Sequence, residues 1–436
     1  MAKTVHIIAA KRTPIGSFQG TLSSLSAPEL GGWAIAATLE QASEKLPSST
    51  SLPFTIDEVY MGCVLTAGCG QAPARQAAIQ AGLSYATPCT TVNKVCGSGM
   101  KTVMMAFDQI LLGHSQCIIA GGMESMTNAP YLLPQARQGF RAGHKTAQDH
   151  MFFDGLQDAY EGHLMGVYGQ ATADEQGFSR EQMDAWAIRS AERAKAAQSD
   201  GRFMDEIVPV VLAQQQKSHS KSGYKSIPEI VSDDEHPNEI QLDKIPKLKP
   251  AFVSSSASKV TSDGESAGSI TAANSSAISD GAAALMLIDS DLSIAHQILP
   301  LAILHGHATH AREPAEFTLA PQFACHALLD KLGWSVEKVD RWEINEAFAV
   351  VTQVAIKGLG IDEERVNVNG GACALGHPIG ASGTRIIVTL IHALQQLQQQ
   401  LINQGENRAV YGVASLCIGG GEATAVAIEL PKSAGL

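Results

Sequence analysis

Two kinds of hydrophobic pattern alternate along the first part of the chain. Short apolar runs are typical of buried strands, and they occur as "HIIAA" at 6–10, "EVYMGCVL" at 58–65 and "QCIIAGGM" at 116–123. Apolar residues spaced three and four apart predict helices that face a core. The clearest such stripe follows Cys96 and ends before Gly113, with apolar positions at Met100, Val103, Met104, Phe107, Ile110 and Leu111. This alternation over residues 4–125 predicts an α/β fold.

The pattern changes at about residue 126. Long polar runs appear at 214–225 and 232–239, and the segment 254–269 is rich in serine, which predicts a mobile, low-complexity stretch. One helix is predicted behind the start signal "FSREQ" at 178–182, with Met183, Trp186, Ala187 and Ser190 on one face. We therefore interpret 126–266 as an inserted loop domain.

Strand and helix patterns return after this stretch. "ISDGAAALMLI" at 278–288 predicts a strand, and "RAVYGVASLCIGGG" at 408–421 predicts the last one. Between them, a helix from about Ser382 carries Ile386, Ile387, Leu390, Ile391 and Leu394 on one face. Both halves show a cysteine followed by glycines at a strand end, which is compatible with a duplicated α/β unit. We divide the chain into an N-terminal core half (1–125 and 267–288), the loop domain and a C-terminal core half (289–436).

Composition narrows the class of protein. Hydrophobic residues make up 45% of the 436 residues and charged residues only 17%, so much of the chain must be interior. A net charge of -12 argues against a nucleic-acid or anionic-membrane surface. No run of eighteen apolar residues offers a membrane span, the strand pattern begins at Val5, and "KSAGL" is not a peroxisomal signal. We expect a soluble, cytoplasmic protein.

The eight cysteines do not suggest zinc or disulfides. They show no C-x-x-C spacing, and an even count implies disulfides mainly in small secreted chains. Cys96 stands out because small residues and a predicted helix follow it directly. A helix N-terminus stabilises a thiolate, although a buried structural cysteine is the commoner reading of one Cys taken alone.

Three other segments could carry chemistry. His377 lies in a stretch of nineteen residues with five glycines, where Pro378 fixes a turn; it suits a general base, or a structural histidine. Asn345 and Glu346 in "INEAFA" stand among apolar neighbours, so they are functional, satisfied by partners, or a helix cap led by Asn345. Cys417 leads into three glycines that could form an oxyanion cradle or a tight sheet corner.

Taken together, these segments resemble the thiolase family. The strings "CGSGMK", "GGMESM", "NEAFA", "NGGACALGHPIGASG" and "CIGGG" follow one another in thiolase order. The resemblance implies a five-layered αβαβα fold with two similar core halves, mixed sheets covered by helices, and an inserted loop domain that binds CoA. It also implies reversible Claisen condensation of two acetyl-CoA to acetoacetyl-CoA plus CoA, or the thiolytic reverse, through an acyl-cysteine.

The resemblance also implies a role for each matching residue. Cys96 is the nucleophile, and His377 accepts its proton and later polarises a thioester oxygen. Cys417 moves the α-proton of the second acetyl-CoA. Asn345 holds a water that, with His377, stabilises the enolate oxygen, and the N–H groups of Cys96 and Gly419 form the second oxyanion hole.

Substrate binding follows the same resemblance. Ser276 lies beside the pantetheine, and an apolar slot is lined by Met165, Phe252 and Phe348. We add the hypothesis that Lys217, Lys221 and Lys225 meet the CoA phosphates. No metal and no tightly bound cofactor is expected, only CoA and acyl-CoA as substrates and products. A homo-oligomer is expected, either a dimer or a dimer-of-dimers tetramer.

Three departures from the family pattern affect the acyl pocket. Leu164 stands where many short-chain thiolases have histidine, Ala273 and Ala277 replace glycines, and the serine-rich insert 254–267 is longer than usual. A thiolase for longer-chain or dicarboxylic 3-ketoacyl-CoA is therefore the alternative, with a degenerate CoA-binding protein as the non-enzyme alternative. A decarboxylating ketoacyl synthase uses two histidines, and Cys417 argues against it.

Overall fold

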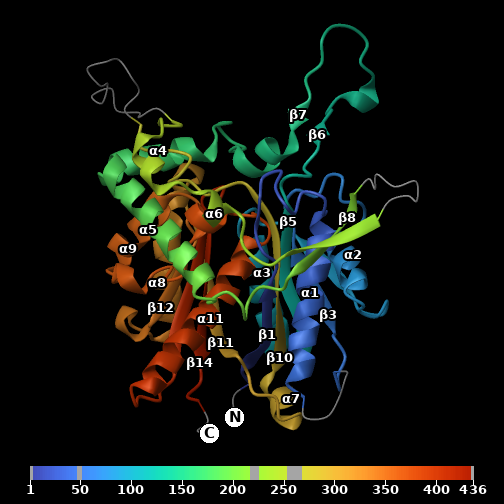
Figure 1. Ribbon diagram of the computed structural model, residues 1–436, viewed down its shortest axis with the longest axis vertical. Helices are drawn as coiled ribbons and strands as arrows, with labels where there is room; N and C mark the ends of the chain where they lie inside the picture. The colour runs from blue at the N-terminus through green and yellow to red at the C-terminus, as the bar shows by residue number, and fades with distance from the viewer. Residues whose placement is uncertain (1–2, 47–51, 217–224, 253–267, 434–436) are drawn as a thin grey trace.

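One mixed sheet forms the frame of the protein. The structure, a computed structural model, describes residues 3–46, 52–216, 225–252 and 268–433 (Figure 1). Its ten-stranded sheet runs in the order β12-β13-β14-β11-β1-β10-β5-β3-β4, and β2 pairs with β10. The strands of the first half are β1 (Val5–Arg12), β2 (Gly16–Ser17), β3 (Glu58–Gly62), β4 (Cys89–Val92), β5 (Cys117–Ser125) and β10 (Ser279–Asp289). Those of the second half are β11 (Ala302–Ala311), β12 (Arg341–Ile344), β13 (Val410–Ile418) and β14 (Glu422–Leu430).

The two halves repeat one topology. The order β3-β5-β10-β1 matches β12-β13-β14-β11, with the first pair parallel and the other pairs antiparallel in both. The halves join where β1 pairs with β11 through Val5–Leu304, His6–Ile303 and Ile7–Ala302. The predicted α/β fold with two similar halves is confirmed.

Three layers of helices and the two halves of the sheet together form five layers. The helices that cover or separate the sheet halves are α1 (Ala27–Glu44), α2 (Pro73–Gln80), α3 (Ser98–Leu111), α8 (Ala320–Leu332), α9 (Ala349–Leu359) and α11 (Ser382–Asn403). α3 and α11 share one apolar cluster with strands of both halves, so they form the middle layer. α1 and α2 pack on the outer face of the first half, and α8 and α9 on that of the second.

The periodicity predicted the middle layer almost completely. The five α11 positions are fully buried, and the predicted α3 stripe is buried up to Ile110. Leu111 is the exception: it is 38% exposed, because it is the last residue of α3 and lies beyond the sheet contact.

Most of the remaining elements lie between β5 and β10. They are β6 (Tyr131–Leu132), β7 (Gln148–Asp149), α4 (Met165–Gln176), α5 (Arg180–Ser199), β8 (Val210–Gln216), β9 (Lys225–Val231) and α6 (His236–Glu239); α7 (Ser290–Ala295) and α10 (Ala372–Leu375) lie in the core halves. The predicted start of α5 is confirmed by a capping box between Ser179 and Gln182. The domain boundaries stay a prediction, and the serine-rich insert 254–267 lies outside the described residues.

The two Cys-Gly segments that suggested a repeat do not occupy equivalent positions in the two halves. Cys96 lies between β4 and α3, whereas Cys417 lies inside β13, whose counterpart in the first half is β5. Equivalent elements are therefore α3 and α11, and the two Cys-Gly segments are similar by sequence alone. Both cysteines still lie near the carboxyl ends of strands, as predicted.

Candidate active site

Cys96 lies in a tight turn between β4 and α3. Val95 adopts a φ of 46°, a left-handed conformation that costs a non-glycine residue roughly 1–2 kcal/mol. Ser98 stabilises the turn: its Oγ donates to the Val95 carbonyl at 2.6 Å and accepts from the Lys94 N–H at 2.8 Å. The strained turn places Cys96 at the mouth of α3, as the sequence predicted.

The resting thiol of Cys96 is protonated. Burial raises its pKa to about 11, although the N–H groups of Gly419 and of Cys96 itself act in the opposite direction. The helix N-terminus by itself therefore does not activate the thiol. Loss of solvation outweighs the helix and backbone dipoles, so Cys96 needs a base.

His377 has the state that a base needs. Burial, and next the charge of Arg385, lower its pKa to about 3, so the imidazole is neutral. Its Nδ1 lies 2.6 Å from Ser382 Oγ, which lies 3.0 Å from the Pro378 carbonyl. A carbonyl cannot donate, so the hydroxyl satisfies both contacts by donating to Pro378 and accepting from Nδ1–H. This assignment leaves Nε2 with a free lone pair.

Asn345 meets that lone pair. Its Nδ2 lies 3.4 Å from His377 Nε2, and its buried Oδ1 has no hydrogen-bond partner among the described residues. The predicted alternative of a helix cap is wrong, because α9 begins at Ala349 and its N-cap is Phe348, with no side-chain cap. Asn345 is thus placed toward His377 rather than toward a helix end.

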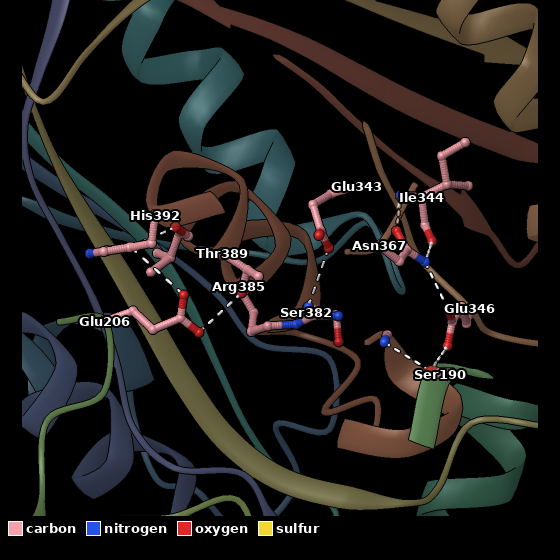
Figure 2. A network of polar contacts seen from close by, with 12 residues as sticks. Ser190, Glu206, Glu343, Ile344, Glu346, Asn367, Ser382, Arg385, Thr389 and His392 are labelled. Atoms are coloured by element: carbon pink, nitrogen blue, oxygen red, sulfur yellow. Dashed lines mark hydrogen bonds and ion pairs between the residues drawn. The ribbon is translucent and has the colours of Figure 1, made fainter. Parts of the chain in front are cut away.

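Glu346, the neighbour of Asn345, is structural. Its carboxylate accepts from Trp186 Nε1 (3.0 Å), Asn367 Nδ2 (2.9 Å), Ser190 Oγ (2.7 Å) and the Cys373 N–H (3.1 Å). Figure 2 shows Glu346 between Asn367 and Ser190 of α5. The carboxylate therefore binds α5 to the end of β12.

Cys417 and the glycines approach Cys96 from the second half. Cys417 is fully buried at the end of β13, where burial and the adjacent Cys96 raise its pKa. Gly419–Gly421 form the turn between β13 and β14, with φ of 91° and 90° at Gly420 and Gly421. The turn is thus a tight sheet corner, and its Gly419 N–H also lies near enough to the Cys96 sulfur to stabilise the thiolate.

One cavity joins the predicted residues. It has a volume of about 210 Å³ and is lined by Cys96, His377, Cys417 and Gly419 together with Ser276, Met165, Phe252 and Phe348. Asn345 lies behind His377 rather than on the cavity wall. Sequence reasoning gave no role to nine further wall residues, which are Phe152, Gly155, Leu156, Gly166, Ser275, Ile278, Phe317, Ala347 and Ile379. Of these, Ile278, Ala347 and Ile379 lie inside segments quoted above, but no pattern in those segments assigns them to a cavity wall.

The remaining predicted features concern the acyl pocket, the lysines, the cysteines and metal binding. Leu164 does line the cavity, as a departure in the acyl pocket should. Lys217 and Lys221 lie outside the described residues, and Lys225 is placed only as the first residue of β9. All eight cysteines are free thiols. Within the described ranges, no cluster of His, Cys, Asp or Glu could hold a metal ion, and no helix has the length and apolar character to cross a membrane.

Comparison with known proteins agrees with this architecture. Residues 5–291 match the family description "Thiolase, N-terminal domain", and residues 298–430 match "Thiolase, C-terminal domain". Acetyl-CoA acetyltransferase of Chromobacterium violaceum is 44% identical over 98% of this chain and 100% of its own length. The mitochondrial acetyl-CoA acetyltransferase of Homo sapiens is 42% identical over 98% of this chain and 90% of its own.

Solved structures extend the agreement to three dimensions. The Acat5 thiolase of Ascaris suum in complex with coenzyme A superimposes with a TM-score of 0.84, at 38% identity over 99% of this chain and 100% of that one. Acetyl-CoA acetyltransferase from Syntrophomonas wolfei gives a TM-score of 0.85 at 35% identity, over 98% and 100%. With both family domains matched, the chain belongs to the thiolase family.

Proposed function

We propose that this thiolase is an acetyl-CoA C-acetyltransferase that makes or cleaves acetoacetyl-CoA through an acetyl group on Cys96. The observation that carries the proposal is the cavity in which Cys96, Cys417 and a neutral His377 meet. Relatives that are 42–44% identical over nearly the whole chain bear the name acetyl-CoA acetyltransferase, which supports the choice of substrate.

In the first half-reaction Cys96 takes the acetyl group. His377 Nε2 removes the thiol proton, and the sulfur attacks the thioester carbonyl of acetyl-CoA. The bond from that carbonyl to the CoA sulfur breaks, and CoA leaves with the proton from His377. The thiol needs this base, because burial raises its pKa to about 11. The N–H groups of Cys96 and Gly419 stabilise the tetrahedral oxyanion, and removing one such donor typically costs roughly 10²–10³ in rate.

In the second half-reaction Cys417 acts as the base. The Cys417 thiol first gives its proton to His377, because burial keeps the resting thiol protonated. The Cys417 thiolate then removes the α-proton of a second acetyl-CoA, and the carbanion attacks the acetyl group on Cys96. The Cys96 sulfur leaves and takes the proton from His377, so acetoacetyl-CoA forms and all three groups return to their resting states. Asn345, through a water, and the protonated His377 stabilise the enolate oxygen. His377 can donate from Nε2 only when protonated, because Nδ1–H is directed to Ser382.

The apolar wall of the cavity binds the rest of the substrate. Phe252, Phe348 and Met165 contact the pantetheine and acyl chain, with Ser276 beside the pantetheine. A short acyl chain is favoured, because Met165 and Phe348 pack with Cys417 in one apolar cluster and limit the space there. Steady-state kinetics on acetoacetyl-CoA, 3-ketooctanoyl-CoA and 3-oxoadipyl-CoA rank the candidates; a higher kcat/KM for either longer substrate contradicts this choice.

The remaining expectations belong to the same proposal. The chain works as a homo-oligomer without a tightly bound cofactor, and we place it in the cytoplasm. Relatives include proteins named as mitochondrial, so the location needs its own test by fractionation or imaging. Sedimentation of the purified protein tests the oligomer directly.

An acyl-enzyme trap tests the central step. Protein incubated with acetyl-CoA and digested should carry one acetyl group, on the peptide that contains Cys96. Cys96→Ala should lose it, whereas Cys89→Ser, a half-buried thiol on β4, should keep it. Acetylation at another cysteine, or none, contradicts the proposal.

A further inference from the structure

We propose that Arg385 and Glu343, which do not line the cavity, are positioning residues that hold the His377–Asn345 pair from behind and set its electrostatics. The inference rests on the proposed roles of His377 and Asn345. It adds two residues that no motif of the sequence singled out.

Arg385 and Glu343 close a ring around the base. Ser382, which accepts from His377, and Arg385 lie one turn apart on α11. Arg385 Nη1 lies 3.7 Å from Glu343 Oε2, and Figure 2 shows the two side chains directed toward one another.

The second side of the ring follows β12. Glu343 and Asn345 are two residues apart, and alternate residues of a strand share one face. Trp342 and Ile344 point the other way, into the outer apolar cluster of the second half. Glu343 and Asn345 therefore both face the middle layer, and the Asn345–His377 contact of 3.4 Å closes the ring.

Burial of the Arg385 guanidinium is energetically unfavourable. Arg385 is 2% exposed, and none of its Nε, Nη1 and Nη2 atoms has a hydrogen-bond partner among the described residues. A buried charge without hydrogen bonds opposes folding, and an apolar side chain of similar size would avoid that cost. Such an unsatisfied group at a site calls for an explanation other than stability.

The surrounding charges define what Arg385 does. The ionisable groups that act on it are Glu343 of β12, Arg12 of β1, and Glu206 and Asp234. Of these, Arg12 is already engaged by Glu206 at 2.6 Å and Asp234 at 2.7 Å. His392, farther along α11, faces Glu206 as well. Glu206 and Asp234 are thus already paired with Arg12. Glu343 is therefore the carboxylate that is available to pair with Arg385.

The position of this charge has a direct effect on the base. A cation behind the imidazole disfavours a second positive charge, so Arg385 adds to the effect of burial that keeps His377 neutral in the resting enzyme. Glu343 limits this effect by partly balancing the cation. Both also fix the spacing between α11 and β12, and hence the reach of Asn345 Nδ2 toward Nε2.

The test compares variants of the full-length enzyme in two half-reactions. Arg385→Met removes the charge with similar volume, Arg385→Lys keeps it, and Arg385→Met/Glu343→Gln neutralises the pair. Each is measured for the rate of Cys96 acetylation and for hydrogen–deuterium exchange at the α-carbon of acetyl-CoA, across pH. Arg202→Met, a partly buried arginine that binds Asn369 and Asp200 instead, is the control.

Arg385→Met should slow both half-reactions by about tenfold or more, because losing the support between α11 and β12 misplaces Asn345 relative to His377. The acid limb of the pH–rate profile of Arg385→Met should move to higher pH, because His377 is more easily protonated without the cation. Arg385→Lys should recover most of the rate, and KM should change little. The double variant should recover stability but not rate, while Arg202→Met keeps the wild-type pH profile.

Two results would overturn the inference. The first is a folded Arg385→Met variant that keeps the rate and the pH profile of the wild-type enzyme. If Arg385→Met does not fold, the same result in the double variant overturns the inference. The other is a rate loss that the double variant restores together with stability, since that indicates a structural role alone. Wild-type protein that is never acetylated on Cys96 contradicts the proposed function instead.

Discussion

Replacing Glu346 with glutamine tests how the site is held together. Its two carboxylate oxygens accept four hydrogen bonds, from Trp186 and Asn367 on one oxygen and from Ser190 and the Cys373 N–H on the other. A glutamine keeps one oxygen and presents an NH₂ group in place of the second. In the better orientation Trp186 and Asn367 keep their acceptor, and the NH₂ faces Ser190 and Cys373.

The cost follows from which donors can adapt. The Ser190 hydroxyl can reverse and accept, but the Cys373 N–H cannot. One buried N–H left without an acceptor costs about 1–3 kcal/mol, and the lost bond from Ser190 to a charged group about 1.5 kcal/mol more. We expect Glu346→Gln to lower the free energy of unfolding by about 2.5–4.5 kcal/mol.

Urea unfolding followed by tryptophan fluorescence measures this difference. Glu363→Gln is the matched control, because this exposed carboxylate pairs with Arg189 at 2.9 Å. Exposed pairs contribute at most about 1 kcal/mol, so the control should stay near wild type. If Glu346→Gln unfolds within 1 kcal/mol of wild type, the carboxylate does not depend on these four donors and the reasoning fails.

Three further predictions follow from single contacts. Cys417→Ser should keep Cys96 acetylation but slow α-hydrogen exchange by about 10²-fold or more, the usual contribution of an acid–base group; equal loss of both steps contradicts the assignment. Gly166→Ala would place a Cβ 2.0 Å from the Phe252 ring, so KM for acyl-CoA should rise, whereas Gly281→Ala, whose nearest contact is 3.4 Å, should leave KM unchanged. Burial raises the pKa of Glu124 to about 7, so the folded protein binds this proton more tightly than the unfolded chain does. The free energy of unfolding should therefore fall as pH rises from about 4.5 to 7, and Glu124→Gln should remove that fall; an unchanged slope in urea titrations would refute it.

The sequence by itself determined the layers and the family. The stripes of α3 and α11 predict their burial directly, because a helix packed between the two halves of the sheet must be apolar along the faces that it buries. The ordered strings around Cys96, Asn345, His377 and Cys417 were enough to predict the family, and with it a single site. These features are local, or are fixed by the order of local motifs.

Only the tertiary structure decided the protonation states and the supports of the site. The pKa of Cys96 rises because the enclosing residues come from both halves, and the tautomer of His377 depends on where Ser382 points. Glu346 meets Trp186 and Ser190 from 160 and 156 residues away, and Glu343 meets Arg385 across two layers. Loss of solvation and pairing depend on which distant residues are brought together, which no local pattern contains.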